Sequence, residues 1–285
     1  MQNVSEGNRI SFRISILASG STGNSTLLET SSTTLLIDAG LGKKEMLRRF
    51  EALGRARPER VDGILVTHEH SDHSTGLAQM AREFNCPVYL TEPTHRAIVK
   101  MFTVEDPEKS SPKAQIARVE YIEAGEDFEV GDIAIHPFNI PHDAEDPVGF
   151  SFRANGTKVA IATDLGYLPL PVKVHLRDAD FLLLESNHDL EKLKFGPYPW
   201  HVKMRIKDRR GHLSNEDASN FLGDSDIFEA RARYIVLGHL SEQNNDPSLA
   251  EICAQQALNS RPSNVAFGGS LHIARQRTPL GPFEL

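Results

Sequence analysis

The densest group of reactive side chains lies at residues 67–73, THEHSDH, with three histidines and an aspartate within six residues. It directly follows Gly63–Thr67, an apolar run of strand length. Alternate side chains of extended backbone point to the same side, so His68 and His70 should converge on one cation. Asp72 and His73 come where the chain turns into a helix and can reach a neighbouring position. Because zinc and similar metals take imidazole and carboxylate donors, the block predicts a metal centre rather than a solvated polar loop.

Further candidate ligands and acid–base groups recur at the ends of apolar segments elsewhere in the chain. They are His142, Asp164, Glu185, His212 and His239. Any one of them could be an ordinary polar group at the end of a strand. Because the placement recurs, on what should be one edge of a sheet, we expect these residues to join residues 67–73 around a single functional site.

The elements that must position these residues are short strands and amphipathic helices, bounded by turn-forming residues. Strands are predicted at Phe12–Ala18, Ser25–Glu29, Thr33–Asp38, Gly63–Thr67, Val88–Thr91, Arg118–Glu123, Phe128–Pro137, Val148–Arg153, Lys158–Thr163, Asp180–Glu185 and Tyr234–Leu237, and helices at Lys43–Leu53, Ser74–Phe84, Asn215–Leu222 and Pro247–Leu258. Strand-rich halves flanked by helices predict an α/β fold of two packed sheets with helices outside. No repeat or linker divides the chain, so we expect one domain over residues 1–285.

Composition narrows the class of protein. Of 285 residues, 39% are hydrophobic and 25% charged, which is typical of a globular chain. The net charge of −8 argues at first against a nucleic-acid-binding domain, which is more often basic. Residues 1–9 are polar, and no apolar run approaches the ~20 residues of a membrane span, so a soluble cytoplasmic protein is expected. Cys86 and Cys253 lie far apart, which favours neither a disulfide framework nor a cysteine metal site.

The order of the candidate residues resembles that of the metallo-β-lactamase superfold. Asp38, the HxHxDH block, His142, Asp164 and His239 follow one another as in that family. Longer strings resemble its YycJ/WalJ subfamily: LASGSTGNS at 17–25, DLGY at 164–167, LESNHD at 184–189, GPYPW at 196–200, GHLSNEDA at 211–218 and GHLSEQNN at 238–245. The resemblance implies an αββα sandwich of two mixed sheets with helices on the outer faces. Members of the subfamily are regarded as 5′→3′ DNA exonucleases.

The resemblance also implies a centre for two divalent metal ions. One ion would be held by His68, His70 and His142 and the other by Asp72, His73 and His239, with Asp164 bridging both. Asp38 would orient a ligand or the bridging water. Zinc is expected, although the same donors also accept manganese or iron.

Two further residues would complete the chemistry in such a family member. His212 matches a histidine that contacts the scissile phosphate, and Glu185 matches the carboxylate that holds it. The pair would act as general acid for the leaving alkoxide. With Asp38 and Asp164, these are the expected catalytic residues.

The implied activity is phosphodiester hydrolysis by a hydroxide that bridges the metal ions, most simply by a 5′→3′ DNA exonuclease. Asp164 favours phosphoesters or thioesters over lactams, and the Glu185–His212 pair favours phosphodiesters. Three alternatives stay open: a phosphodiesterase acting on cyclic or ribosyl phosphates, a ribonuclease of the ribonuclease Z type, and a nucleic-acid-binding or regulatory protein with a structural or degenerate metal site. The oligomeric state is not determined by the sequence.

Substrate contacts are predicted in two places. Ser21 and Asn24 lie in the turn at residues 19–25, whose backbone amides could hold a phosphate or form a plain tight turn. Lys203, Arg205, Arg209 and Arg210 belong to a run with five positive charges in eight residues. Such a run is either a solvated helix face or a contact with the nucleic-acid backbone. Nearby, Tyr198 and Trp200 could stack on bases or pack in a core.

Overall fold

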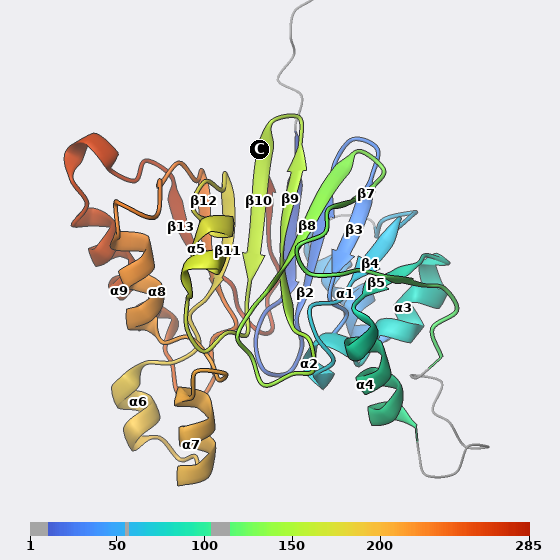
Figure 1. The fold of residues 1–285 in the computed structure, drawn as a ribbon, viewed down its shortest axis with the longest axis horizontal. Helices are drawn as coiled ribbons and strands as arrows, with labels where there is room; N and C mark the ends of the chain where they lie inside the picture. The colour runs from blue at the N-terminus through green and yellow to red at the C-terminus, as the bar shows by residue number, and fades with distance from the viewer. Residues whose placement is uncertain (1–10, 55–56, 104–114) are drawn as a thin grey trace, which may run out of the picture.

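The computed structural model describes residues 11–54, 57–103 and 115–285, so the polar segment 1–9 lies outside the described residues. Its strands form two seven-stranded sheets (Figure 1). The first sheet has the order β14-β1-β2-β3-β4-β5-β6, with β1 Arg13–Ala18, β2 Ser25–Glu29, β3 Thr34–Ile37, β4 Gly63–Leu65, β5 Val88–Leu90, β6 Val119–Tyr121 and β14 Leu280–Glu284. The second has the order β13-β12-β11-β10-β9-β8-β7, with β7 Phe128–Val130, β8 Ile133–Asn139, β9 Val148–Ala154, β10 Thr157–Ala162, β11 Phe181–Glu185, β12 Tyr234–Gly238 and β13 Ser270–Ile273.

Each sheet is mixed, and its parallel half carries the functional edge. Strands β3 to β6 are parallel, as are β10 to β13, whereas the remaining pairs are antiparallel. Ile37 pairs with Leu65, and Glu185 pairs with Gly238. The residues that follow these strands therefore leave each sheet side by side at its carboxyl edge, where ligands bind in open α/β sheets.

Helices cover the outer face of each sheet (Figure 1). Beside the first sheet lie α1 Lys43–Ala52, α3 Leu77–Phe84 and α4 Glu92–Phe102, and beside the second lie α5 Leu170–Leu176, α8 Asn215–Gly223 and α9 Pro247–Asn259. The short helix α2, Ser71–Ser74, lies at the carboxyl edge, and a 3-10 helix spans Ser263–Val265. Helices α6 Leu190–Phe195 and α7 Trp200–Lys207 extend beyond the sandwich at the same end. This is the αββα arrangement that the sequence predicts.

Alternating side chains explain why many strands are apolar along their whole length. In β11, Phe181 and Leu183 pack between the sheets, whereas Leu182 and Leu184 pack under the helices of the second sheet. Both faces of the strand are thus covered, and neither face needs polar residues. Because full burial of such a side chain contributes about 1.5–3 kcal/mol, the three apolar layers hold the sheet edges in place.

Two predicted elements are wrong in detail. The predicted strand Phe128–Pro137 is a hairpin, because Gly131 turns the chain between β7 and β8 with φ of 60°. The predicted helix Ser74–Phe84 is divided into α2 and α3 at Thr75 and Gly76. At Gly76 the chain passes so close to Leu41 that an added Cβ would lie 1.9 Å from the Leu41 carbonyl oxygen. Helices α4 to α7 and strands β13 and β14 were not predicted. Helix α4 has a recognisable start, because Thr91 accepts a hydrogen bond from the Thr94 amide and a proline follows.

Two expectations from composition can be compared with the structure. Cys86 is buried and Cys253 half-buried, and both are free thiols. None of the helices in the described ranges is long and apolar enough to cross a membrane.

Candidate metal centre and active site

The ends of five strands place the central polar residues. Asp38 follows β3, His68 follows β4, Asp164 follows β10, Glu185 ends β11 and His239 follows β12. Asp38, Asp164 and His239 have φ angles of 60°, 63° and 53°, in the left-handed region that residues other than glycine seldom adopt. Such backbone costs about 1–3 kcal/mol per residue and is retained only where the surroundings enforce it. All three side chains are buried, so the fold itself turns them toward the centre.

The first donor group consists of His68, His70 and His142, whose ligand atoms lie within 4.8 Å of one another. His142 Nε2 is 3.2 Å from His70 Nδ1. Among the described residues, buried His68 Nε2 finds no hydrogen-bond partner. A buried polar nitrogen without a partner is costly, and a cation at this position would satisfy it. The arrangement therefore fits a metal ion.

The second donor group consists of Asp72, His73, Asp164 and His239. His73 Nε2 lies 3.3 Å from Asp164 Oδ2, and His239 Nε2 lies 3.4 Å from Asp72 Oδ2. Within the described chain, buried Asp164 Oδ2 has no partner of good hydrogen-bond geometry. The other oxygen, Asp164 Oδ1, is 3.9 Å from His142 Nε2 of the first group. Asp164 thus lies between the two groups, where a bridging ligand would be.

Hydrogen bonds on the outer side of the rings orient the donors. His73 Nδ1 donates to Asp38 Oδ2 at 2.7 Å, and Asp38 Oδ1 accepts from the Thr67 amide at 2.8 Å. His142 Nδ1 donates to the Gly211 carbonyl at 3.1 Å. In both histidines this leaves Nε2 facing the centre, which is the usual arrangement of a metal-binding imidazole. Asp38 lies outside both donor groups and contacts His73, as expected for a residue that orients a ligand.

Glu185 holds two histidines at once. Its Oε1 accepts from His212 Nδ1 and from His239 Nδ1, each at 2.8 Å. Its Oε2 accepts from the Leu165 and Leu213 amides at 2.9 and 3.1 Å. Glu185 is fully buried, whereas 20% of the His212 side chain is exposed. The predicted Glu185–His212 contact is present, and the contact with His239 is an addition that sequence reasoning missed.

The charges in this centre are strongly coupled. Burial alone would raise the pKa of Glu185, but His212 and His239 lower it to about 2. Burial alone would lower the pKa of His239, but Asp164, Asp72 and Glu185 raise it to about 10. Carboxylates buried this closely together require positive charge beside them, as protons on imidazole or as bound cations. The centre is therefore suited to cations.

The predicted substrate contacts in the turn at residues 19–25 differ in exposure. Ser21 is exposed. Asn24 is buried: its Oδ1 accepts from the Gly20 amide, and its Nδ2 lies 2.9 Å from His73 Nε2 and 3.2 Å from Asp72 Oδ2. Asn24 thus holds the turn at residues 19–25 next to the candidate ligands Asp72 and His73. Substrate contact by either residue stays a prediction.

The predicted basic contacts are largely engaged with the protein. Arg205 forms an ion pair with Asp143, and Arg209 lies over the Tyr167 ring, 4.4 Å from its centroid. Arg210 donates to the carbonyls of His142 and Ala144. Lys203 donates to the Lys194 carbonyl. Arg205 and Arg210 thus attach α7 and the following loop to residues 142–144, whereas Lys203 links α7 to α6. A direct contact of these residues with phosphate stays a prediction.

Sequence reasoning missed three residues that shape the centre. Thr67 Oγ1 lies 2.9 Å from Asp38 Oδ2 and 3.0 Å from His68 Nδ1. Ser19 Oγ accepts from the His239 amide at 2.7 Å. Gly40 lies so close to α2 that an added Cβ would be 1.6 Å from the Asp72 carbonyl oxygen. Thr67 and Ser19 belong to strings that the sequence analysis singled out, whereas Gly40 carried no separate signal.

The family of the chain follows from comparison with known proteins. A family model described as the beta-lactamase superfamily domain matches residues 33–239. The metallo-beta-lactamase fold protein YhfI from Bacillus subtilis superposes with a TM-score of 0.66 at 15% identity, covering 95% of this chain and 99% of that one. The short form of human tRNase Z gives a TM-score of 0.62 at 16% identity, with the same coverage. The chain belongs to the beta-lactamase superfamily.

Two curated relatives define the group more closely. Exodeoxyribonuclease YycJ of Bacillus anthracis is 37% identical over 266 residues, covering 93% of this chain and 96% of the relative. Exodeoxyribonuclease WalJ of Streptococcus pneumoniae strain D39 is 39% identical over 243 residues, covering 85% and 87%. Within the superfamily the chain is a YycJ/WalJ-like protein. With both donor groups present, it is a metal-dependent hydrolase.

The close approach at Gly40 leads to the first prediction. In Gly40→Ala, the new Cβ would collide with the backbone of Asp72 and Asn24. Helix α2 must then shift, so we expect zinc affinity to fall at least ~10-fold, the scale of lost outer-shell support. Competition with a chromophoric chelator measures this. Gly42→Ala is the matched control, because its Cβ would meet nothing within 4 Å. Equal zinc affinity in the two variants would contradict the prediction.

Buried His188 leads to a prediction about pH. Burial lowers its pKa from 6.5 to about 4, and in the described structure its Nδ1 has no hydrogen-bond partner. The unfolded chain therefore binds a proton between pH 6.5 and 4 that the folded protein excludes, and stability falls as pH falls through this window. From pH 7 to pH 5, the wild type should lose about 2 kcal/mol more unfolding free energy than His188→Gln.

Urea unfolding at the two pH values measures this difference. His201→Gln, which changes an exposed histidine, serves as the control and should follow the wild type. If His188→Gln loses as much stability as the wild type, His188 is not excluded from protonation in the folded protein.

Proposed function

We propose that the protein is a metal-dependent phosphodiesterase that hydrolyses DNA from the 5′ end, with two divalent cations in its centre. The observation that carries the proposal is the placement of Asp164 between two donor groups, with Glu185 holding His212 beside them. One group alone would suit a mononuclear hydrolase. A carboxylate between two groups and an oriented, partly exposed histidine together suit a charged phosphodiester.

The side chains of the centre are themselves suitable ligands for two cations. His68, His70 and His142 would hold one ion, and Asp72, His73 and His239 the other, with Asp164 shared. When bound, two divalent cations activate a water molecule and neutralise charge on the phosphate oxygens. Zinc suits these donors, and manganese or iron are the alternatives.

The residues of the chain supply the remaining steps. His212 Nδ1 is tied to Glu185, so its Nε2 is the nitrogen available to hold or release a proton. Because His212 is partly exposed at the edge of the centre, it can give that proton to the departing alkoxide oxygen. The Glu185 carboxylate accepts from His212 Nδ1 and so fixes the orientation of the imidazole ring. Asp38 and Thr67 contact His73 Nδ1 and so keep its Nε2 directed toward the second donor group.

DNA is the preferred substrate in this proposal because both curated relatives that cover most of the chain are named exodeoxyribonucleases. A 5′→3′ direction and a cytoplasmic location belong to the same proposal. The structural likeness to tRNase Z concerns the fold and does not favour RNA. A phosphodiesterase for small cyclic or ribosyl phosphates is the alternative that shares the same centre.

A substrate panel tests the activity. Purified protein with Mn²⁺ or Zn²⁺ should release labelled mononucleotides from 5′-labelled DNA at early times and act more slowly on RNA and bis-p-nitrophenyl phosphate. Chelation with EDTA should abolish cleavage. Asp164→Asn is the inactive control: asparagine tolerates the left-handed backbone at this position but removes the shared charge. Cleavage of bis-p-nitrophenyl phosphate alone would favour the small-molecule alternative, and full DNA cleavage by Asp164→Asn would exclude the proposed centre.

The role of His212 gives a separate prediction. His212→Ala should lower kcat on DNA by ~10²–10⁴, the usual contribution of general acid catalysis, while the metal content stays near that of the wild type. Turnover and metal analysis on the same preparation measure both. His95→Ala is the matched control, because this half-buried histidine lies on α4, away from the centre and from α7. If metal is lost with His212, the residue is a ligand and not the acid.

A further inference from the structure

Helices α6 and α7 and the loop that follows, residues 190–210, form a projection that we call the arm (Figure 1). Helix α7, all of whose residues the structure describes, buries none of its side chains, and α6 buries only Leu193. A surface helix normally buries one apolar face against its own protein. The packing of the sandwich therefore does not account for the composition of the arm.

The arm exposes large apolar side chains. Phe195 is 74% and Trp200 73% exposed, the highest values among the exposed large hydrophobic residues of the described chain. Met204 and Leu190 on the same two helices are also exposed. The core-packing alternative for Trp200 is thus wrong. Exposed aromatic rings are a typical platform for unpaired bases, which stack on them with little regard to sequence.

The arm is also strongly basic in an acidic protein. It carries two acidic residues, Glu191 and Asp208, and seven basic ones, although the chain as a whole has a net charge of −8: Lys192, Lys194, Lys203, Arg205, Lys207, Arg209 and Arg210. The side chain of Lys207 is exposed and makes no hydrogen bond or ion pair with another described residue. Lys194 lies over the Phe195 ring at 4.9 Å from its centroid. Lys194 also lies 3.8 Å from Glu191, so its charge is placed beside the Phe195 ring and is only partly offset by an exposed carboxylate.

The base of the arm is attached to the centre. Arg205 pairs with Asp143, which directly follows His142. The Gly211 carbonyl accepts from His142 Nδ1, and His212 is the next residue. Gly211 also packs tightly against the end of α7, because an added Cβ would lie 2.2 Å from the Ile206 carbonyl oxygen. A strand bound along the arm would thus lead into the centre.

We propose that the arm binds the single-stranded part of a nucleic-acid substrate, with bases stacked on Trp200 and Phe195 and phosphates next to Lys194 and Lys207. This inference rests on the proposed function, and it adds that the arm holds the nucleic-acid strand that the metal centre cleaves. Bases stacked inside a duplex offer no open ring face, which favours single-stranded nucleotides over duplex. A second copy of the chain is disfavoured as the occupant, because two arms would bring like charges together.

Trp200 is the only tryptophan of the chain, so intrinsic fluorescence reports on the arm alone. The probe is a 12-residue thymidine oligonucleotide with phosphorothioate linkages, which slow its cleavage. It should quench the wild-type emission in a saturable manner that weakens with salt. Phe195→Ala should weaken binding about tenfold, as expected for loss of one stacked base. Lys194→Gln with Lys207→Gln should also weaken binding and reduce the salt dependence, because each phosphate contact contributes ~0.7 to the slope for single strands.

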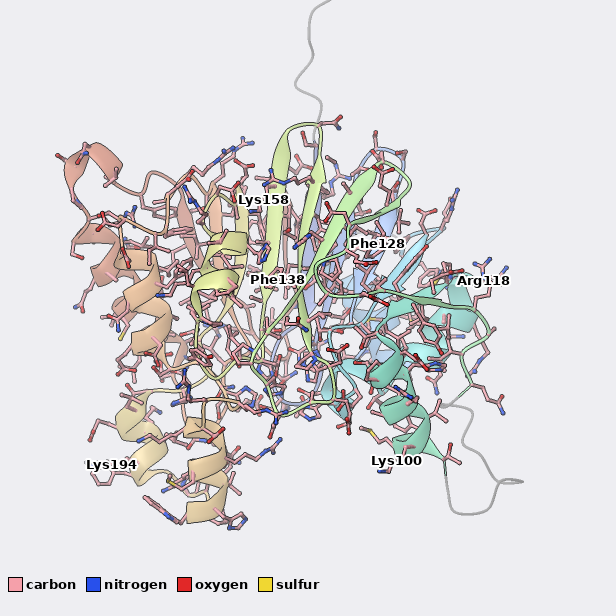
Figure 2. The ribbon with its side chains drawn as sticks, viewed as in Figure 1. Lys100, Arg118, Phe128, Phe138, Lys158 and Lys194 are labelled. Carbon is pink, nitrogen blue, oxygen red and sulfur yellow. The ribbon has the colours of Figure 1, made fainter. Side chains whose placement is uncertain are left out.

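The matched control is Lys100→Gln, which removes an exposed lysine from α4, on the other side of the molecule (Figure 2). It should bind as the wild type does. Absence of quenching, or equal binding by the arm variants, would overturn the proposal. So would a change in Trp200 emission that appears only with anionic lipid vesicles, or only with rising protein concentration as copies associate.

Kinetics distinguish this proposal from the proposed function. The ratio of kcat/KM for a 12-residue DNA strand to that for a dinucleotide should fall about tenfold in the arm variants and stay unchanged in Lys100→Gln. If the wild type cleaves no phosphodiester, the proposed function fails, whereas fluorescence binding still tests the arm. If the wild type cleaves DNA and the arm variants keep the wild-type ratio, only the arm proposal fails.

Discussion

The burial of several carboxylates where the carboxyl edges of the two sheets meet is the constraint on which the rest of the structure depends. Asp38, Asp164 and Glu185 are almost fully buried, and Asp72 lies beside them. Ions buried this way are costly unless they are paired and hydrogen-bonded. Imidazole rings from both sheets supply that pairing, and bound cations would supply more. The centre therefore links the two halves of the sandwich electrostatically as well as chemically.

The fold meets this constraint through backbone geometry. Asp38, Asp164 and His239, which follow β3, β10 and β12, adopt left-handed backbone conformations that direct their side chains inward. The absence of a side chain at Gly40 lets α2 pack against the first sheet. These features would be unfavourable in isolation. They persist because the apolar layers on both faces of each sheet determine where the strands end.

The net charge of −8 takes on a different meaning once the residues are placed. Several acidic residues lie in the centre, where bound cations would offset their charge. Seven of the basic residues lie on the arm beside the centre. Local potential, rather than the total charge, governs the attraction of a phosphate backbone. An acidic protein can thus present a basic path to a metal centre.

The sequence by itself determined the donor types, the strand ends that carry them and two packed sheets with helices outside, because these depend on periods of two and on residues adjacent in the chain. The αββα class came from the resemblance to a known family. The sequence did not determine that Glu185 holds His239 as well as His212, that Asn24 closes against His73, or that α6 and α7 leave the sandwich. Those partners lie far apart along the chain, as with Ser19 and His239, which are separated by 220 positions. Only the packing of the two sheets brings such residues within hydrogen-bond distance, so only the tertiary structure decided how the donors are oriented.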